Sequence, residues 1–174
     1  WIFTPSMFLF LVYNWDMLAI LFTVIAFYFM RKERWRYAAF FIALGFSAKF
    51  FPIIYLAPFL FVVKPIYEKL KVLGVFCTTA LIINLPFMIL NFNGWLYFFK
   101  FNSERNSNPD SIWTIFRFVF GEIGISNINL ISFALFVGTF LFVLWRYREA
   151  GILKLCFAGT ILFLFFNKVF SPQY

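Results

Sequence analysis

A cluster of polar side chains follows the last apolar run of the chain. It reads Asn167-Lys168-Val169-Phe170-Ser171-Pro172-Gln173-Tyr174 and comes directly after the apolar residues 153–166. Polar groups at the end of a membrane helix are costly unless they face a cavity or a polar headgroup, so they indicate a site. We therefore take Lys168 as a candidate phosphate ligand, with Ser171, Gln173 and Tyr174 as further site candidates.

Lys49 is a second cation in apolar surroundings, in the sequence Lys49-Phe50-Phe51-Pro52. A charged lysine between aromatic residues needs an anionic partner, and a lipid phosphate or a diphosphate meets that need. The alternative is that the long apolar stem of Lys49 lets its ammonium group reach the membrane surface. Both interpretations stay open at the level of sequence.

Three other charged residues could belong to the same site. Arg105 and Asp110 lie in the polar stretch 91–111, and Asp16 precedes the apolar run 17–30. Arg105 is a candidate phosphate ligand, and the two aspartates are candidate site residues. A solvated loop is the favoured alternative for Arg105 and Asp110, and a helix N-cap is the alternative for Asp16.

The sequence carries no motif of a soluble enzyme. It has no glycine-rich phosphate loop, no metal-ligand cluster and no nucleophile beside a base. Histidine is absent, which excludes histidine ligands and histidine bases within this sequence. We therefore predict no metal and no cofactor.

Composition indicates a membrane protein. Hydrophobic residues make up 64% of the chain and charged residues 13%, against about 25% charged in soluble domains. Spanning segments must satisfy their own backbone hydrogen bonds, and long unbroken apolar runs disfavour a β-barrel, so we predict an all-α fold. The net charge of +8 lies in short islands between apolar runs, which disfavours nucleic acid as a partner.

The basic residues divide unevenly between alternate loops. Islands at 31–36, 64–71 and 146–154 hold most of the lysines and arginines, so the positive-inside rule places them on the cytoplasmic side. The stretches 91–129 and 167–174 then lie on the extracytoplasmic side. We expect one multi-pass transmembrane domain over 1–174, with cytoplasmic loops near 31–36, 64–71 and 146–150.

The segment 37–63 has basic islands at both ends, yet each of its arms is well short of the roughly 20 residues that a spanning helix needs. Pro52 lacks an N–H and disfavours a helical conformation at Phe51. We therefore expect a short broken hairpin with its tip at Lys49–Pro52, and one broken span is the alternative. Residues 112–120 are predicted to form an amphipathic helix at the membrane surface, with Trp113 and Arg117 at headgroup level.

Four short sequences resemble one family of membrane enzymes. They are Asn14-Trp15-Asp16, Lys49-Phe50-Phe51-Pro52, Asn108-Pro109-Asp110-Ser111-Ile112-Trp113 and the closing cluster Asn167–Tyr174. In this order they resemble the glycosyltransferases of the GT-C fold. Glycosyltransferase family 87 and the catalytic subunit of the first mannosyltransferase of GPI-anchor synthesis are the most similar. The resemblance covers nearly the whole chain and is most specific in the closing cluster.

The resemblance implies a polytopic helix bundle that transfers a sugar with inversion, using a polyprenyl- or dolichyl-phosphate-mannose donor. It also implies a catalytic aspartate in a loop before Trp1, so we expect this chain to be an internal fragment, incomplete at both ends and without its catalytic base. The predicted function is transfer of a sugar, mannose by preference, to an acceptor hydroxyl on the extracytoplasmic side. The predicted donor-phosphate ligands are Lys49, Arg105 and Lys168.

The expected partners are this lipid-linked donor, a glycolipid or other acceptor, and membrane lipids, in a prokaryotic plasma membrane rather than the endoplasmic reticulum. One alternative is a secondary transporter or a lipid-handling membrane protein, in which a broken hairpin and charges at membrane depth would line a substrate path. A third interpretation is a structural membrane subunit with no chemistry of its own.

Overall fold

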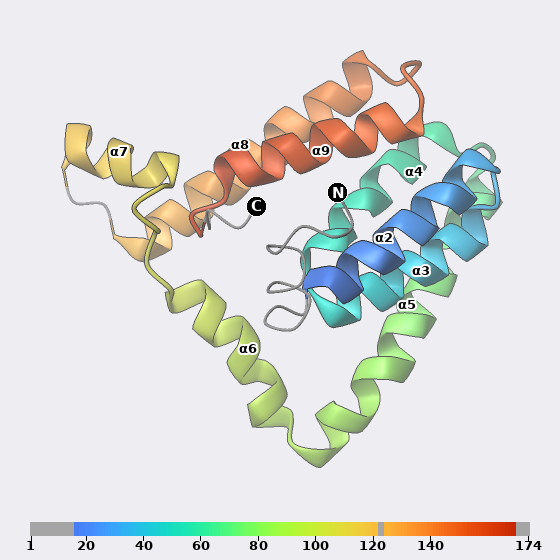
Figure 1. Cartoon of the computed structure of the whole chain (residues 1–174), viewed down its shortest axis with the longest axis horizontal. Helices are drawn as coiled ribbons and strands as arrows, with labels where there is room; N and C mark the ends of the chain where they lie inside the picture. Colours follow the sequence, from blue (N-terminus) through green and yellow to red (C-terminus); the bar gives the residue numbers. More distant parts are fainter. Residues whose placement is uncertain (1–15, 122–123, 170–174) are drawn as a thin grey trace, which may run out of the picture. The chain divides into compact units, whose positions relative to one another are not determined.

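The structure is a computed structural model that describes residues 16–121 and 124–169. Over these residues it contains eight α-helices, one short 3-10 helix and no strand, which confirms the predicted all-α class. The chain forms two compact units. The first unit is Trp1–Pro86 with Glu149–Cys156, and the second is Phe87–Arg148 with Phe157–Tyr174. Figure 1 shows the course of the helices along the chain.

The first unit begins with the antiparallel helices α2 and α3. Its elements are α2 (Asp16–Arg31), α3 (Trp35–Ala48), the 3-10 helix η1 (Phe51–Tyr55), α4 (Leu56–Val62) and most of α5 (Ile66–Leu90). The second unit contains the pair α8 and α9 and two shorter helices. Its elements are α6 (Phe92–Glu104), α7 (Ile112–Phe120), α8 (Ile125–Arg146) and most of α9 (Ile152–Phe166).

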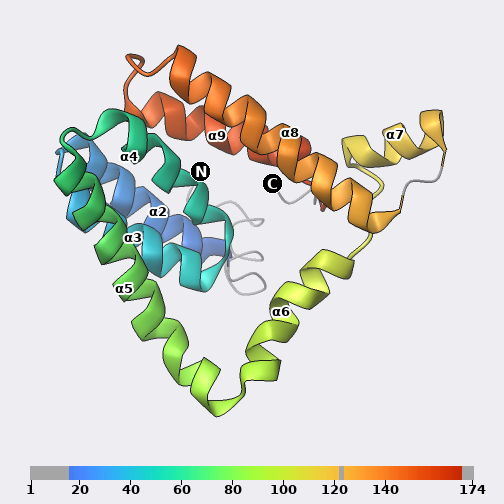
Figure 2. The ribbon, with the colours of Figure 1, turned by 180° about the vertical axis from the view of Figure 1, so that it is seen from behind.

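Small residues let α2 and α3 approach closely. The buried residues of α2 recur at the spacing of one helix face, and they are Asp16, Ala19, Thr23, Ala26 and Met30. Those of α3 are also mostly small, namely Ala38, Ala39, Ile42, Ala43 and Gly45. Because lipid tails are as apolar as the side chains, helices in a membrane associate through close packing, which small residues permit. Figures 1 and 2 both show α2 and α3 side by side.

The turn between α2 and α3 is a Schellman motif. The N–H of Arg34 donates to the carbonyl of Phe29 at 2.9 Å, and the N–H of Glu33 donates to that of Met30 at 3.0 Å. Glu33 takes the left-handed conformation that this motif requires, with φ of 55°. Glycine is the usual residue at such a position because it has no Cβ. Glu33 therefore occupies a position that local conformation alone would give to glycine.

The segment 37–63 doubles back at Lys49, as the hairpin interpretation predicted. Lys49 is extended (φ −155°, ψ 137°) and ends α3, and Pro52 follows in the first turn of η1. The turn is tight, since a Cβ added to Gly45 would lie 3.2 Å from Cγ of Pro52. Farther along the arms, the rings of Trp35 and Phe59 meet edge to face at 5.8 Å. The two arms of the segment thus run antiparallel.

Among the residues that the structure describes, two helices are long and apolar enough to cross a membrane. They are Ile66–Leu90, with a mean hydropathy of 2.1, and the part Asn127–Arg146 of α8, with 2.2. Only 11% and 17% of these apolar windows is buried, whereas the core helix of a soluble protein would be mostly buried. Their surfaces suit lipid. Helix α9 is equally apolar in character but has 15 residues.

Helices α8 and α9 pack through an aromatic ring set against a glycine. They run side by side in both views (Figures 1 and 2). The ring of Phe140 covers Gly159, where an added Cβ would come within 2.6 Å of Cζ. One turn along α8, the rings of Phe136 and Phe163 meet edge to face at 6.0 Å. Gly159 therefore provides the space that Phe140 occupies.

The stretch 91–129, which was predicted to be an extracytoplasmic loop, is largely helical. It holds α6 and α7 and the beginning of α8. Asn91 looked like a loop residue, but its side-chain oxygen accepts a hydrogen bond from the N–H of Gly94 at 2.8 Å and so caps α6. Asparagine is common both in loops and at helix N-caps, which is why composition alone did not separate the two.

We predict that Gly159→Ala destabilises the second unit by about 1–3 kcal/mol, because the new methyl group overpacks the ring of Phe140. The matched control is Gly138→Ala in α8, whose added Cβ meets nothing within 4 Å in the described part of the chain. The control should be neutral or slightly stabilising, because alanine is the better helix former. Thermal unfolding of both variants in detergent, followed by circular dichroism, measures the difference. Equal melting temperatures would show that Phe140 does not press on Gly159.

Candidate functional site

Two side chains from other helices bind the last carbonyl group of α9. The carbonyl of Phe166 accepts hydrogen bonds from Nε1 of Trp113 at 2.8 Å and from Oγ of Ser132. The final carbonyls of a helix have no partner within the helix, and in an apolar setting they need donors from elsewhere. Trp113 and Ser132 therefore hold α7 and α8 against the end of α9.

Lys168 is fixed at both its backbone and its side chain. Its carbonyl accepts from the N–H of Asn108 at 2.9 Å, and its Nζ donates to the carbonyl of Ser103 at 3.0 Å. The same carbonyl of Ser103 accepts from Nδ2 of Asn129 at 2.7 Å. Lys168 is only 8% exposed, which is unusual for a lysine. We call residues 103–114 together with 166–168 the polar junction.

Arg105 is the charged residue that acts on Lys168. Burial, and the positive charge of Arg105 nearby, lower the pKa of Lys168 below its ordinary value of 10.5. No acidic side chain of the described residues forms an ion pair with either cation. The buried Lys168 thus lies within the influence of a second positive charge, that of the exposed Arg105. An anion bound there would raise the pKa of Lys168 again, so the charges favour an anion over a cation.

The polar junction also holds a hydroxyl group that lacks a partner. Oγ of Ser107 is buried and makes no hydrogen bond to the described residues. A buried donor left unsatisfied costs about 1–3 kcal/mol, so such groups usually bind a water or a ligand. By contrast, Oγ1 of Thr114 is satisfied by the carbonyl of Asn108 at 2.7 Å. Ser107 is therefore a further candidate ligand, which sequence analysis missed because serine is ordinary in a polar stretch.

Arg105 lies near enough to Lys168 to lower its pKa, and the role of both as phosphate ligands stays a prediction. Asp110 is exposed, in the turn that precedes α7, and forms no ion pair within the described residues. This position fits the solvated-loop interpretation. The other members of the closing cluster, Ser171, Gln173 and Tyr174, lie outside the described residues.

Lys49 has an anionic partner within the chain. Its ammonium group forms an ion pair with Asp16 at the first turn of α2, and the side chain of Asp16 is only 12% exposed. Both residues belong to the first unit, whereas Arg105 and Lys168 belong to the second. The need of Lys49 for an anion is thus met at least in part by Asp16. Its role as a ligand of a donor phosphate stays a prediction.

Asn84 is a polar residue of α5 that sequence analysis did not single out. Its Nδ2 donates to the carbonyl of Ala80 at 2.8 Å and to Oγ of Ser47 at 3.2 Å. Hydrogen bonds of this kind join helices in apolar surroundings. A lone asparagine within the run 72–90 was the available signal, and it marks the contact between α5 and α3.

Helix α7 buries its tryptophan within the protein. Its bounds Ile112–Phe120 are as expected, and Trp113 is 3% exposed. The depth of Trp113 and Arg117 in a membrane stays a prediction. The apolar residues Ile115, Phe118, Val119 and Phe120 are exposed, Phe118 at 92%. A water-facing helix would not present such a surface, whereas a helix at a membrane would.

Comparison with protein-family models, with curated proteins and with solved structures finds no match. The site is therefore interpreted from its own geometry and from the sequence motifs.

We predict that Arg105→Gln raises the pKa of Lys168 toward 10.5, because it removes the neighbouring positive charge while burial remains. Lys100→Gln is the matched control, since Lys100 is a surface lysine of α6 with its own partner, Glu104, at 4.0 Å. NMR titration of ¹³Cε-labelled lysine follows the signal of Lys168, assigned through its loss in Lys168→Met. If Lys168 has the same titration midpoint in Arg105→Gln as in Lys100→Gln, Arg105 does not act on Lys168.

Proposed function

We propose that this protein is a multi-pass membrane glycosyltransferase and that its polar junction binds the phosphate of a polyprenyl-phosphate sugar. The observation that carries the proposal is the buried Lys168 beside Arg105, without an acidic partner among the described residues. The resemblance of the closing cluster to GT-C enzymes supports mannose as the sugar and the extracytoplasmic face as the place of transfer.

The chemistry explains why two cations are useful. The bond between the anomeric carbon of the sugar and the phosphate oxygen breaks, and its electron pair leaves with the lipid phosphate. The acceptor oxygen bonds to the anomeric carbon from the opposite face, so the configuration inverts, and its proton passes to a base that remains unassigned. Lys168 and Arg105 would stabilise the negative charge that develops on the phosphate in a site of reduced dielectric.

A lipid-linked substrate also needs an apolar surface for its chain. In the second unit, α7 begins at the polar junction with Ser111 and Trp113 and then exposes Ile115, Phe118 and Phe120. The exposed apolar helix α7 thus follows directly in sequence after the residues that would bind the phosphate. This neighbourhood supports a polyprenyl phosphate over a soluble nucleotide sugar.

The direction of the long helices supports a multi-pass arrangement with the junction outside. The helix α5 starts after Lys64 and ends before α6, and α8 ends at Arg146. Both helices therefore have a basic island at one end and the junction-bearing segment 91–124 at the other. With the basic ends on the cytoplasmic side, residues 103–114 lie on the extracytoplasmic side.

We predict that Lys168→Met lowers kcat/KM for mannosyl transfer by about 10²-fold, and that Arg105→Gln lowers it less. Lys168 is held by two hydrogen bonds at the junction, whereas Arg105 is exposed. Lys100→Met is the matched control, because it removes a surface lysine of α6 and should leave kcat/KM unchanged. The assay follows radiolabelled mannose from its polyprenyl-phosphate donor into lipid or protein, in membranes that carry the full-length gene product.

Two results would contradict this proposal. Unchanged transfer by Lys168→Met would show that the junction does not hold the donor phosphate. Binding of the lipid phosphate that depends on Lys168, without any transfer by the full-length protein, would identify a lipid-handling protein in place of an enzyme.

A further inference from the structure

The first unit contains a cavity of about 680 Å³ at the end where α2 meets α3. Three segments line it: the end of α2 with its turn, the end of α4, and the beginning of α9. Their lining residues are Met30, Arg31, Glu33 and Trp35, then Val62, Val63 and Lys64, then Ala150, Gly151, Ile152, Leu153 and Lys154. The volume lies within the range of about 300–1,000 Å³ that is typical of small-ligand sites. None of these residues belongs to the polar junction.

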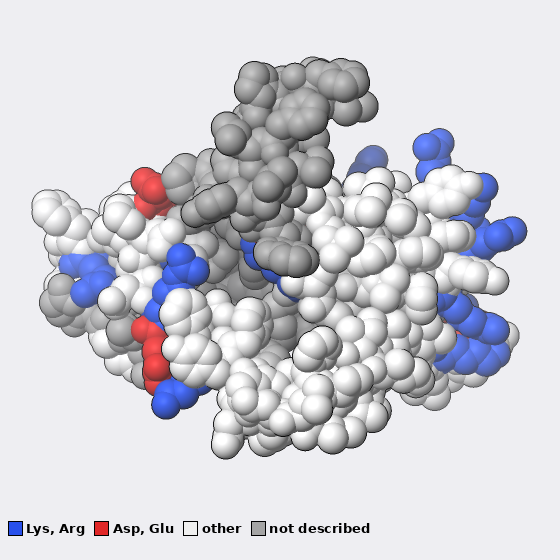
Figure 3. All heavy atoms as spheres, turned by 60° about the horizontal axis from the view of Figure 1, so that its bottom comes forward, with Lys and Arg blue, Asp and Glu red and all other residues white. Residues whose placement is uncertain are grey.

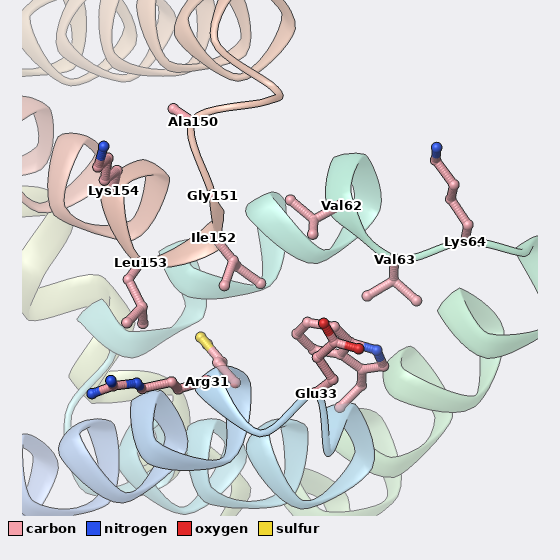
Figure 4. A pocket seen from close by; sticks show the side chains of 12 residues that line it. Arg31, Glu33, Val62, Val63, Lys64, Ala150, Gly151, Ile152, Leu153 and Lys154 are labelled. Carbon is pink, nitrogen blue, oxygen red and sulfur yellow. The ribbon is translucent and has the colours of Figure 1, made fainter.

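The lining has an apolar middle and a cationic margin. Figure 4 shows Val62, Val63 and Ile152 around the centre, while the side chains of Lys64 and Lys154 extend outward at opposite sides. Arg31 lies at the margin on the side of Lys154. Figure 3 shows lysine and arginine side chains gathered at the right of the view. A ligand with a charged head and an apolar body fits this lining.

The charges of the cavity favour an anion. Arg31, Lys64 and Lys154 form no ion pair with the described residues. Glu68 of the same unit is engaged by Arg36 at 3.1 Å and Lys71 at 3.0 Å. Glu33 is the one acid in the lining, so three cations face one carboxylate. Arg31 also lies in the last turn of α2, where a cation complements the helix dipole. Lys64 and Lys154 lie outside such a last turn, so the dipole does not account for them.

The position of Lys64 places the cavity at the boundary of a membrane. Lys64 lies two residues before α5, which is long and apolar enough to cross one. The first turn of α5 exposes Ile66 at 67% and Tyr67 at 55%, and Nζ of Lys71 lies 4.8 Å from the ring centroid of Tyr67. Exposed tyrosines and lysines beside a spanning helix are typical of headgroup depth. Basic pockets at this depth, on the side of the basic loops, are suited to anionic lipid headgroups.

We propose that this cavity is a binding site for the headgroup of an anionic phospholipid of the inner leaflet. The phosphate lies at the cationic margin, on the side of Arg31 and Lys154, while Lys64 adds positive charge at the opposite side. The glycerol and first acyl carbons lie against Val62, Val63 and Ile152. This site is separate from the proposed donor site, because it uses other residues and lies at the opposite end of α5 along the chain.

The test compares two triple variants with the same loss of charge. One removes the lining cations, in Arg31→Gln with Lys64→Gln and Lys154→Gln. The control removes one cation from each of the same three islands outside the lining, in Lys32→Gln with Lys69→Gln and Arg148→Gln. Native mass spectrometry of the purified protein measures binding of phosphatidylglycerol against phosphatidylcholine. We expect the lining variant to lose at least about tenfold in preference for phosphatidylglycerol, and the control less than about twofold.

Glu33→Gln is expected to increase lipid affinity, a result that misfolding of the variant would not produce. Removing the carboxylate from the lining should raise the affinity for phosphatidylglycerol severalfold and leave that for phosphatidylcholine unchanged. Weaker lipid binding by this variant would indicate a headgroup ammonium beside Glu33 and would overturn the proposal of an anionic lipid.

Three other results would overturn the proposal. Equal losses in both triple variants would mean that the anionic lipid is attracted by the whole basic surface and not by the cavity. Full competition by soluble glycerol phosphate would identify a small phosphate compound as the ligand. The unchanged protein could also bind phosphatidylglycerol and phosphatidylcholine equally well and release both when a polyglutamate peptide is added. That result would identify an acidic protein segment as the ligand. All three measurements are independent of transferase activity, so they stand or fall separately from the proposed function.

Discussion

The last carbonyl groups of α9 need hydrogen-bond donors, and meeting that need organises the second unit. Donors from the protein meet this need: they come from α7 and α8 for α9 itself, and from the chain between α6 and α7 for the carbonyl of Lys168 just beyond α9. Trp113 and Ser132 bind the carbonyl of Phe166, and the N–H of Asn108 binds that of Lys168. A polar stretch that would otherwise be solvated is thereby drawn to the end of an apolar helix.

The lysines Lys49 and Lys168 have different partners. Lys49 forms an ion pair with Asp16. Lys168 lies near Arg105 and donates to a neutral carbonyl, although the same unit also holds the ion pair of Lys100 with Glu104. An ion pair balances charge within the protein, whereas two adjacent cations leave it to be balanced from outside. This contrast is the physical basis for placing a phosphate at the polar junction.

The sequence predicted the helices better than it predicted what their polar residues do. Apolar runs and basic islands located the long helices, because both follow from the membrane as a solvent. The broken hairpin followed from Pro52. The partners of Lys49 and Lys168 could not be predicted, because Asp16 and Ser103 are distant in sequence and the second contact is to a backbone carbonyl, which carries no residue signature. The hydrogen bond of Trp113 could not be predicted for the same reason, since its partner is also a backbone carbonyl.

The double attachment of Lys168 has a consequence for how an anion would bind. A free lysine samples many rotamers, and ordering it costs up to about 2 kcal/mol of side-chain entropy. Here the backbone and the ammonium group are both held by hydrogen bonds, so this ordering occurs when the protein folds. An arriving phosphate meets a positive charge that is already in position, with little left to reorganise. The proposed phosphate site would thus be ordered before its ligand arrives.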